Sequence, residues 1–330
     1  MSVTAPPRTA TIPAPAAVVA ALLVLVVATR RWIGHWFDGP ALQNWSTIFV
    51  AISVQAMPFL VLGVAVSGAI AAFVPQAFLA KALPRRAVLS VPVAALAGAA
   101  LPGCECGSVP VAGRLVARGA PPAAAVTFLL SAPAVNPIVL VATSVAFPGR
   151  PMMVLARFLA SLLAAIVVGL VWSKVGKDEW VAKAKGSSVE GTRAQLFFDT
   201  ALHDVLHAGG FLVVGAGLAA TLQTVVPRNV LDSVAGRGPI AVVALAGLAV
   251  LLAVCSEADA FIAASLSQFS FTARLAFMTV GPMVDVKLIA MQAGTFGRRF
   301  ATRFAPLTFV AALGSAALIG WWLLPSGAGR

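Results

Sequence analysis

The sequence contains no tyrosine, and its 330 residues include three cysteines, three histidines and eleven acidic residues. Charged residues make up 10% of the chain and hydrophobic residues 60%, whereas soluble domains carry about 25% charged residues. So little charge argues against a soluble domain, and three cysteines cannot form the disulfide framework of a small secreted protein. The apolar residues form long runs rather than amphipathic stripes, which is typical of segments that cross a bilayer. We therefore expect an all-α polytopic membrane protein.

The sequence also lacks the common motifs of energy coupling and catalysis. It has no Walker A loop, no GxGxxG before a helix, no HExxH and no GxSxG. We therefore expect neither an enzyme nor a bound cofactor, and ATP-driven pumping by this chain alone has no support. The energy for any transport would come from an ion gradient, such as a coupling proton, or from a partner membrane subunit.

The net charge of +12 could suggest nucleic-acid binding, but the basic residues lie in short clusters between the apolar runs. Clusters at Lys81–Arg86, Lys174–Arg193 and Arg298–Arg303 are typical of cytoplasmic loops that follow the positive-inside rule. We predict that Arg150 and Arg228–Arg237 lie on the other side of a cell's inner (plasma) membrane. The expected partner is the lipid bilayer, and not nucleic acid.

The polar segments suggest how the chain is divided. The first apolar run, Ala16–Ala28, is followed by Arg30 and Arg31 rather than by a signal-peptide cleavage site, so a retained helix is expected. The charged stretch Lys174–Gln195 contains glycine and serine and indicates a linker. The predicted parts are a tail with the first membrane helix (1–43), a first membrane repeat (44–177), a cytoplasmic linker (178–195) and a second membrane repeat (196–326).

The two predicted repeats resemble each other. Pairs that match at one common offset are Cys106 with Cys255, Phe128 with Phe277, Pro133 with Pro282 and Asn136 with Asp285. Gly63 and Gly215 also match, in similar apolar contexts. Because equivalent basic clusters are predicted on opposite sides of the membrane, we expect inverted topology. The predicted fold is one leading helix and two inverted repeats with broken or re-entrant helices, about 8–11 membrane segments in all.

The segment "LPGCECGSVP", residues 101–110, holds two of the three cysteines. Residues i and i+2 share a face of an extended backbone but not of a helix. The flanking glycines and prolines, including Pro110, favour such a non-helical segment. Cys104 and Cys106, joined by Cys255, would then form a three-sulfur site for a soft species such as Cu(I), Zn(II) or a trivalent arsenical. Alternatively, each cysteine packs as a small apolar side chain.

Four of the eleven acids lie in the matched segments: Glu105, Glu257, Asp259 and Asp285. An ionisable group at bilayer depth costs roughly 2.5–3.5 kcal/mol, and such groups usually face a cavity and act there. We therefore expect these acids to bind substrate, balance charge or carry a coupling proton. Lys287 is expected to pair with Asp285 or another buried acid. The alternative places these segments in loops outside the membrane.

Matched prolines interrupt two apolar runs. Pro133 precedes Asn136 and Pro137, and Pro282 precedes Asp285. Proline disrupts a helix, asparagine and aspartate are preferred N-caps, and proline suits the first helical position. Two matched broken helices near the membrane midplane point to a transporter site. Structural kinks with local caps are the alternative.

A third polar pattern is a helical stripe. Asp199, His203 and His207 share one helix face, which is compatible with a metal site or a proton relay. The simpler interpretation is the polar face of a helix that enters the membrane from the linker. Arg114 and Arg118 similarly indicate a basic face at the cytoplasmic end of a short helix.

Two segments resemble the signatures of a known family. "CECGSVPVAGRLVARGAPPAAAVTFLLSAPAVNPIVL" (104–140) and "CSEADAFIAASLSQFSFTARLAFMTVGPMVDVKLI" (255–289) are similar to the paired motifs of a family of predicted permeases that includes bacterial organoarsenical efflux permeases. The resemblance covers nearly the whole chain after the first helix and implies an inner-membrane permease. Many members have serine where this chain has Glu105, and an added carboxylate suits a metal cation better than a neutral methylated arsenical.

Together these features predict a secondary transporter that exports a thiophilic metal ion or metalloid species by alternating access. The predicted substrate-binding residues are Cys104, Glu105, Cys106, Cys255, Asn136, Asp285, Glu257 and Asp259. The predicted structural breaks are Pro110, Pro133, Pro137 and Pro282. Two alternatives are a non-transporting membrane subunit of a metal-handling complex, and a membrane thiol–disulfide oxidoreductase, although ring closure within Cys-x-Cys is strained.

Overall fold

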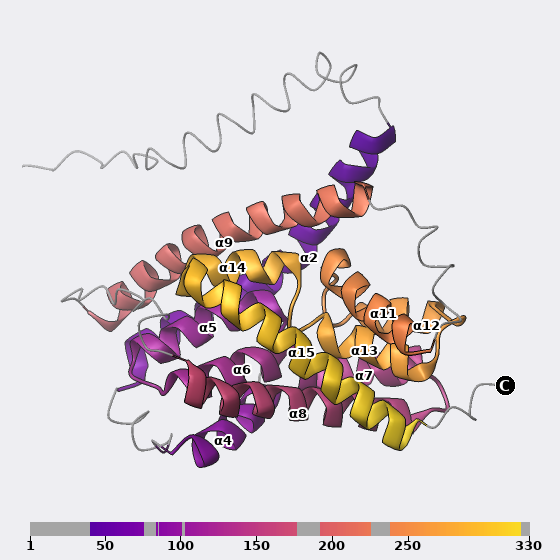
Figure 1. The fold of residues 1–330 in the computed structure, drawn as a ribbon. Coiled ribbons are helices and arrows are strands. Elements are labelled where there is room, and N and C mark those ends of the chain that lie inside the picture. Colours follow the sequence, from indigo (N-terminus) through magenta and orange to yellow (C-terminus); the bar gives the residue numbers. More distant parts are fainter. Residues whose placement is uncertain are drawn as a thin grey trace, which may run out of the picture. The chain divides into compact units, whose positions relative to one another are not determined.

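The computed structural model describes residues 40–75, 84, 86–100, 103–176, 192–225 and 238–324, and this part of the chain contains helices but no strand. The leading helix predicted near Ala16–Ala28 and most of the predicted linker lie outside the described residues. The helices are α2 (Pro40–Phe73), α4 (Ala87–Ala100), α5 (Glu105–Ala117), α6 (Pro122–Val135), α7 (Pro137–Ala146), α8 (Pro151–Val175), α9 (Arg193–Val225), α11 (Pro239–Leu252), α12 (Asp259–Ser265), α13 (Phe271–Val280), α14 (Val286–Phe296) and α15 (Arg298–Leu323) (Figure 1).

Five helical segments in the described part are long and apolar enough to cross a membrane. They are Ala41–Phe73, Pro122–Ala146, Pro151–Val175, Arg193–Val225 and Arg298–Leu323. Helices α4, α11 and α13 are shorter but also apolar. Many large side chains on the long helices face outward, among them Val54, Leu206 and Trp321, as expected where the solvent is lipid. The all-α polytopic class is confirmed.

The order of helices repeats along the chain. A long helix, α2 or α9, comes first, and α4 to α8 are followed in the same order by α11 to α15. The first half, α2 to α8, also contacts the second half, α9 to α15, in a reciprocal way. Helix α5 packs on α14, and its counterpart α12 packs on α7. Reciprocal contacts of this kind are what a twofold relation between two halves produces.

The equivalent helices α8 and α15 pack against each other and run antiparallel (Figure 1). Trp172, near the end of α8, makes edge contacts with Phe300 and Phe304 in the first two turns of α15. Equivalent spans that run antiparallel cross a bilayer in opposite directions, which is the inverted topology predicted from the charges. The same packing places the predicted cytoplasmic residues Lys174 and Arg298–Arg303 at one end of the helix pair.

Helix breaks occur at the two predicted caps. Asn136 is extended and its Oδ1 accepts from the amide of Val139, so it caps α7, and Pro137 takes the first helical position. Asp285 caps α14 through the amide of Leu288, at 2.5 Å. Both capping predictions are confirmed, and Pro282 lies in the turn that precedes Asp285.

Two of the predicted proline breaks are wrong. Pro133 lies inside α6 and Pro110 inside α5, and both helices continue past them. A proline at position i leaves the carbonyl of residue i−4 without its helical donor. Ser108 of α5 donates its hydroxyl to the Leu129 carbonyl, at 3.3 Å, which is the carbonyl that Pro133 leaves free. A neighbouring helix therefore satisfies the group, and the break falls three residues later at Asn136.

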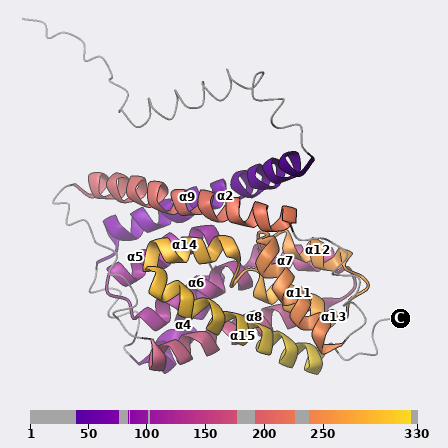
Figure 2. The ribbon, with the colours of Figure 1, turned by 45° about the horizontal axis from the view of Figure 1, so that its top comes forward.

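The matched glycines allow close helix crossings. A Cβ atom on Gly63 would collide with the backbone of Gly107 in α5, and one on Gly215 would lie 2.8 Å from Cα of Lys287 in α14. The first long helix of each half, α2 or α9, therefore lies in backbone contact with a helix, α5 or α14, that carries a buried charged residue near its start. Figure 2 shows α9 alongside α14.

We predict that Gly215→Ala destabilises the protein by about 1–3 kcal/mol, the usual cost of overpacking, because the new methyl group meets backbone rather than a movable side chain. Gly217→Ala on the same helix is the matched control, since nothing lies within 4 Å of its Cβ position. Thermal unfolding in detergent should show a lower Tm for Gly215→Ala and an unchanged or higher Tm for Gly217→Ala. Equal Tm values for the two variants would contradict this packing.

Candidate functional site

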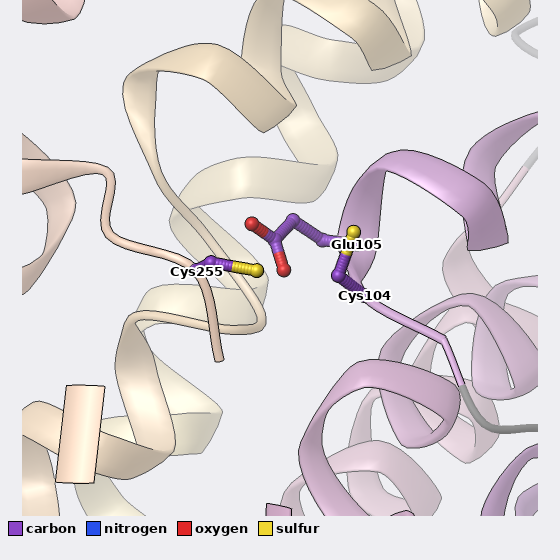
Figure 3. A group of neighbouring side chains, drawn as sticks. All are labelled: Cys104, Glu105 and Cys255. Carbon is purple, nitrogen blue, oxygen red and sulfur yellow. The ribbon is translucent and has the colours of Figure 1, made fainter. Parts of the chain in front are cut away.

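Three donor side chains from the two halves meet in the interior (Figure 3). One ligand atom each from Cys104, Glu105 and Cys255 lies within 4.8 Å of the other two, and all three residues are buried. The sulfur of Cys255 points from one side toward the Glu105 carboxylate and the Cys104 sulfur on the other side (Figure 3). The structure thus brings together three of the residues predicted from the sequence.

The first half positions its two donors at the start of a helix. Cys104 is the extended N-cap of α5, and the helix begins at Glu105. The Asn136 side-chain amide donates to the carbonyls of Gly103, at 3.1 Å, and of Ala132, at 2.9 Å. The break between α6 and α7 therefore anchors the residue that precedes Cys104.

The expected extended Cys-x-Cys segment is wrong. Only Cys104 has an extended backbone, whereas Cys106 lies in the first turn of α5, because the helix already begins at Glu105, between the two cysteines. Cys106 is fully buried, but it does not belong to the group of donor atoms within 4.8 Å of one another among the described residues. The carboxylate of Glu105 takes the third place instead.

The second half positions Cys255 by ending a helix abruptly. Helix α11 stops at Leu252, and Ala253 has a left-handed backbone with φ of 47°. A non-glycine residue in this conformation is strained, and such strain is common at functional sites. The Gln223 side chain donates to the Leu252 carbonyl at 2.6 Å. The Cys255 thiol then donates to Glu257 Oε2 at 2.6 Å, which fixes its direction.

Two buried ion pairs connect the halves in a reciprocal way. Lys287 of the second half donates to Glu105 Oε1 at 2.6 Å, and Arg157 of the first half lies 2.7 Å from Asp259 Oδ2. Each acid is the first residue of its helix, α5 or α12, where the helix dipole also favours negative charge. Lys287 lies 3.9 Å from Asp285 as well, so it contacts two acids.

The site has more acceptor atoms than its cations satisfy. Among the described residues, one carboxylate oxygen of each of four acids is buried without a hydrogen-bond partner: Glu105 Oε2, Glu257 Oε1, Asp259 Oδ1 and Asp285 Oδ2. Buried acceptors are normally paired, since leaving one unpaired is costly. Oxygens and sulfurs that remain available in one enclosed region are suited to binding a cation.

A cavity of about 190 Å³ reaches this region from between α2, α9 and α11. Cys255 and Lys287 line its inner part, and Gln55 and Gln223 contribute polar groups to an otherwise apolar wall. Of the three donors, Cys255 therefore borders a space large enough for a small ion with some water.

Arg157, which the sequence analysis missed, is fully buried in α8. Its guanidinium also donates to the Thr143 hydroxyl, at 2.9 Å, and to the Ser256 carbonyl, at 3.1 Å. The bond to the carbonyl of Ser256 holds the residue that follows Cys255 in place. The signal was present in the sequence, because a single arginine inside an apolar run must find a buried partner.

The histidine stripe lies apart from the donor group. His203 and His207 are exposed, their rings stack, and a His207 nitrogen lies 3.1 Å from the Gly294 carbonyl.

Asp204, which was not singled out in the sequence, pairs with Arg114 at 3.1 Å. This pair connects α9 to α5, and the Arg118 guanidinium donates to the Val74 carbonyl at 3.4 Å.

A helical membrane protein with matched broken helices around a buried polar site has the architecture of a membrane permease. Residues 41–320 match the model of a family described as "predicted permease", and the chain belongs to this family. Two curated relatives were found. One is the UPF0718 protein YcgR of Bacillus subtilis (strain 168), which is 36% identical over 80% of this chain and 92% of its own.

The second relative comes from Streptococcus mutans serotype c and is named "Putative two-component membrane permease complex subunit". It is 33% identical over 78% of this chain and 88% of its own. No solved structure matches the chain. The relatives and the apolar helices support a multi-pass membrane permease.

Removing one partner of a buried ion pair leaves an uncompensated charge, which costs about 3–5 kcal/mol. We therefore predict that Arg157→Met strongly lowers the stability measured by thermal or chemical unfolding in detergent. The double variant Arg157→Met/Asp259→Leu should regain most of the loss. Arg299→Met, at an exposed position of α15, is the control and should change stability by less than about 0.5 kcal/mol. A double variant as unstable as Arg157→Met would refute the pairing.

Proposed function

We propose that the protein is a secondary transporter of the plasma membrane that exports a thiophilic metal ion or metalloid species. The observation that carries the proposal is the buried meeting of Cys104, Glu105 and Cys255 within 4.8 Å at the junction of the two halves. Each half alone supplies an incomplete donor set. A site assembled from both halves suits alternating access, in which one half moves against the other around a central substrate.

The donor types limit the substrate. Thiolates favour soft or borderline species such as Cu(I), Zn(II) and trivalent arsenic, whereas carboxylates favour harder cations. Two sulfurs with one carboxylate therefore support a charged metal ion over a neutral methylated arsenical. The free Oε2 of Glu105 is the oxygen best placed to contact it, because Oε1 already accepts from Lys287.

The remaining buried polar residues have supporting roles in this proposal. Asn136 uses its amide and its carbonyl oxygen on backbone groups, so it positions Cys104 rather than contacting substrate. Glu257, Asp259 and Asp285 each keep one oxygen without a hydrogen-bond partner. They supply negative charge around the substrate or carry the coupling proton.

The proposal is tested with purified protein in proteoliposomes, using Cu(I), Zn(II), arsenite and methylarsenite with and without a proton gradient. We expect movement of at least one of these substrates. Cys104→Ser, Cys255→Ser and Glu105→Gln should each reduce the rate by about tenfold or more, as is common when residues around a metal are removed. Cys106→Ser is the comparison variant in the same helical turn: because Cys106 lies outside the group of three mutually close donor atoms, this change should reduce the rate less than Cys104→Ser does.

Size-exclusion profiles of each variant separate a lost function from a lost fold. Transport by a variant with all three cysteines changed to serine at the wild-type rate would refute the cysteine site. A loss for Cys106→Ser as large as that for Cys104→Ser would refute the placement of Cys106 outside the donor group, and wild-type transport by Glu105→Gln would refute the assignment of Glu105 as a donor.

The name of the Streptococcus relative favours a second candidate, a membrane subunit of a permease complex. In that case this chain would form the path and a partner subunit would supply the substrate or the driving force. Transport by purified chain alone would exclude this alternative. No transport until a second membrane or surface subunit is added would support it. Membership of a permease family favours both candidates over a thiol–disulfide enzyme.

A further inference from the structure

A second cavity, of about 920 Å³, lies between α11, α13 and α15. It lies at the start of α11, whereas the cysteine site lies beyond the end of that helix. Its walls are apolar, with Val242 and Val243 from α11 and Val310 and Leu313 from α15. Val243 and Val310 are more than half exposed, so the cavity continues onto the apolar surface of two membrane helices. The three helices lie side by side in Figures 1 and 2.

Positive charge gathers at one end of this cavity. The guanidinium of Arg274, which lines the cavity, and that of Arg150 lie 5.0 Å and 4.3 Å from the centre of the Phe271 ring. Arg274 is 8% exposed, its Nε donates to the Phe269 carbonyl at 3.1 Å, and among the described residues no carboxylate forms an ion pair with it.

Backbone groups add to this positive end. Helix α11 begins at Pro239 and α13 at Phe271, both in the cavity wall. Helix N-termini carry partial positive charge, which favours an anion, and at α13 the Ser270 hydroxyl already accepts from the Ala273 amide. The hydroxyl of Ser267 and the amide of Gln268 also line the cavity and can donate hydrogen bonds to phosphate oxygens.

The fold itself does not require this charge. The offset that matches Phe277 with Phe128 also matches Arg274 with Ala125, and Phe271 with Pro122. Ala125 is buried and α6 is complete without an arginine there. A nearly buried arginine is costly in a membrane protein and usually serves a function. In the first half, the equivalent helix α6 packs with alanine at this position.

We propose that this cavity is a binding site for an anionic phospholipid. The phosphate lies at the guanidinium group of Arg274, where charge-assisted hydrogen bonds are strong, with Arg150 adding positive charge from the other contact on the Phe271 ring, and an acyl chain lies in the apolar groove between α11 and α15. Basic pockets between membrane helices bind anionic head groups in this way. The long apolar walls, open to the hydrocarbon, favour a lipid over a soluble phosphate compound.

The test is lipid retention by purified full-length protein, measured by native mass spectrometry during titration with phosphatidylglycerol or phosphatidylcholine. We expect selective binding of phosphatidylglycerol, with a Kd raised about tenfold in Arg274→Gln, as loss of a charged hydrogen bond implies. Arg299→Gln, an equal change of charge at an exposed position, should bind as wild type does.

A second variant leaves every charge in place. Gly314 lines the cavity and nothing lies within 4 Å of its Cβ position, so Gly314→Leu should fold and fill the groove. It should lose phosphatidylglycerol binding as Arg274→Gln does. Equal binding of the two lipids by the wild type, or unchanged binding by Gly314→Leu, would overturn the proposal. Competition by inorganic phosphate as effective as by phosphatidylglycerol would overturn the assignment to a lipid.

Discussion

The buried charges of the two halves constrain the rest of the structure. Glu105 begins α5 and Asp259 begins α12, and each receives its cation from the other half, as Lys287 or Arg157. An isolated ion in a low-dielectric interior costs several kcal/mol even after relaxation. Neither half can therefore bury its acid alone. The ion pairs add little net stability compared with apolar packing, but they penalise any arrangement that separates α5 from α14 or α12 from α8.

The same pairs relate the proposed substrate to movement of the halves. Lys287 supplies positive charge to Glu105 Oε1, and the other oxygen of Glu105 has no hydrogen-bond partner. A metal ion bound between Cys104, Glu105 and Cys255 would supply positive charge at the same carboxylate. The contact between Lys287 and Glu105 would then matter less to α5, and the junction of the halves could rearrange at a smaller electrostatic cost. A substrate changes a conformational equilibrium only through such differential interactions.

Local chemistry made part of this structure predictable. Asn136 and Asp285 cap helices through amides three residues ahead, so the sequence alone contains both partners. Pro133 could not be interpreted in this way, because the donor to the carbonyl it frees is Ser108 on another helix. Lys287 and Glu105 are 182 residues apart. Their pairing, and the exclusion of Cys106 from the donor group, depend on how helices pack, which no local pattern specifies.

Duplication provides an internal control for deciding which residues the fold needs. Gly63 and Gly215 are matched glycines, and each allows a close crossing, of α2 on α5 in the first half and of α9 on α14 in the second. Where matched positions differ, one half shows that the helix forms without the unusual residue. Ile138 is exposed at the position that matches the buried Lys287, and Ala125 stands where the second half has Arg274. Arg274 is thus a costly residue that packing does not require, whereas Lys287 is needed to pair the buried Glu105, and both line cavities. For Arg274, this is the pattern expected when function, rather than folding, maintains a buried charge.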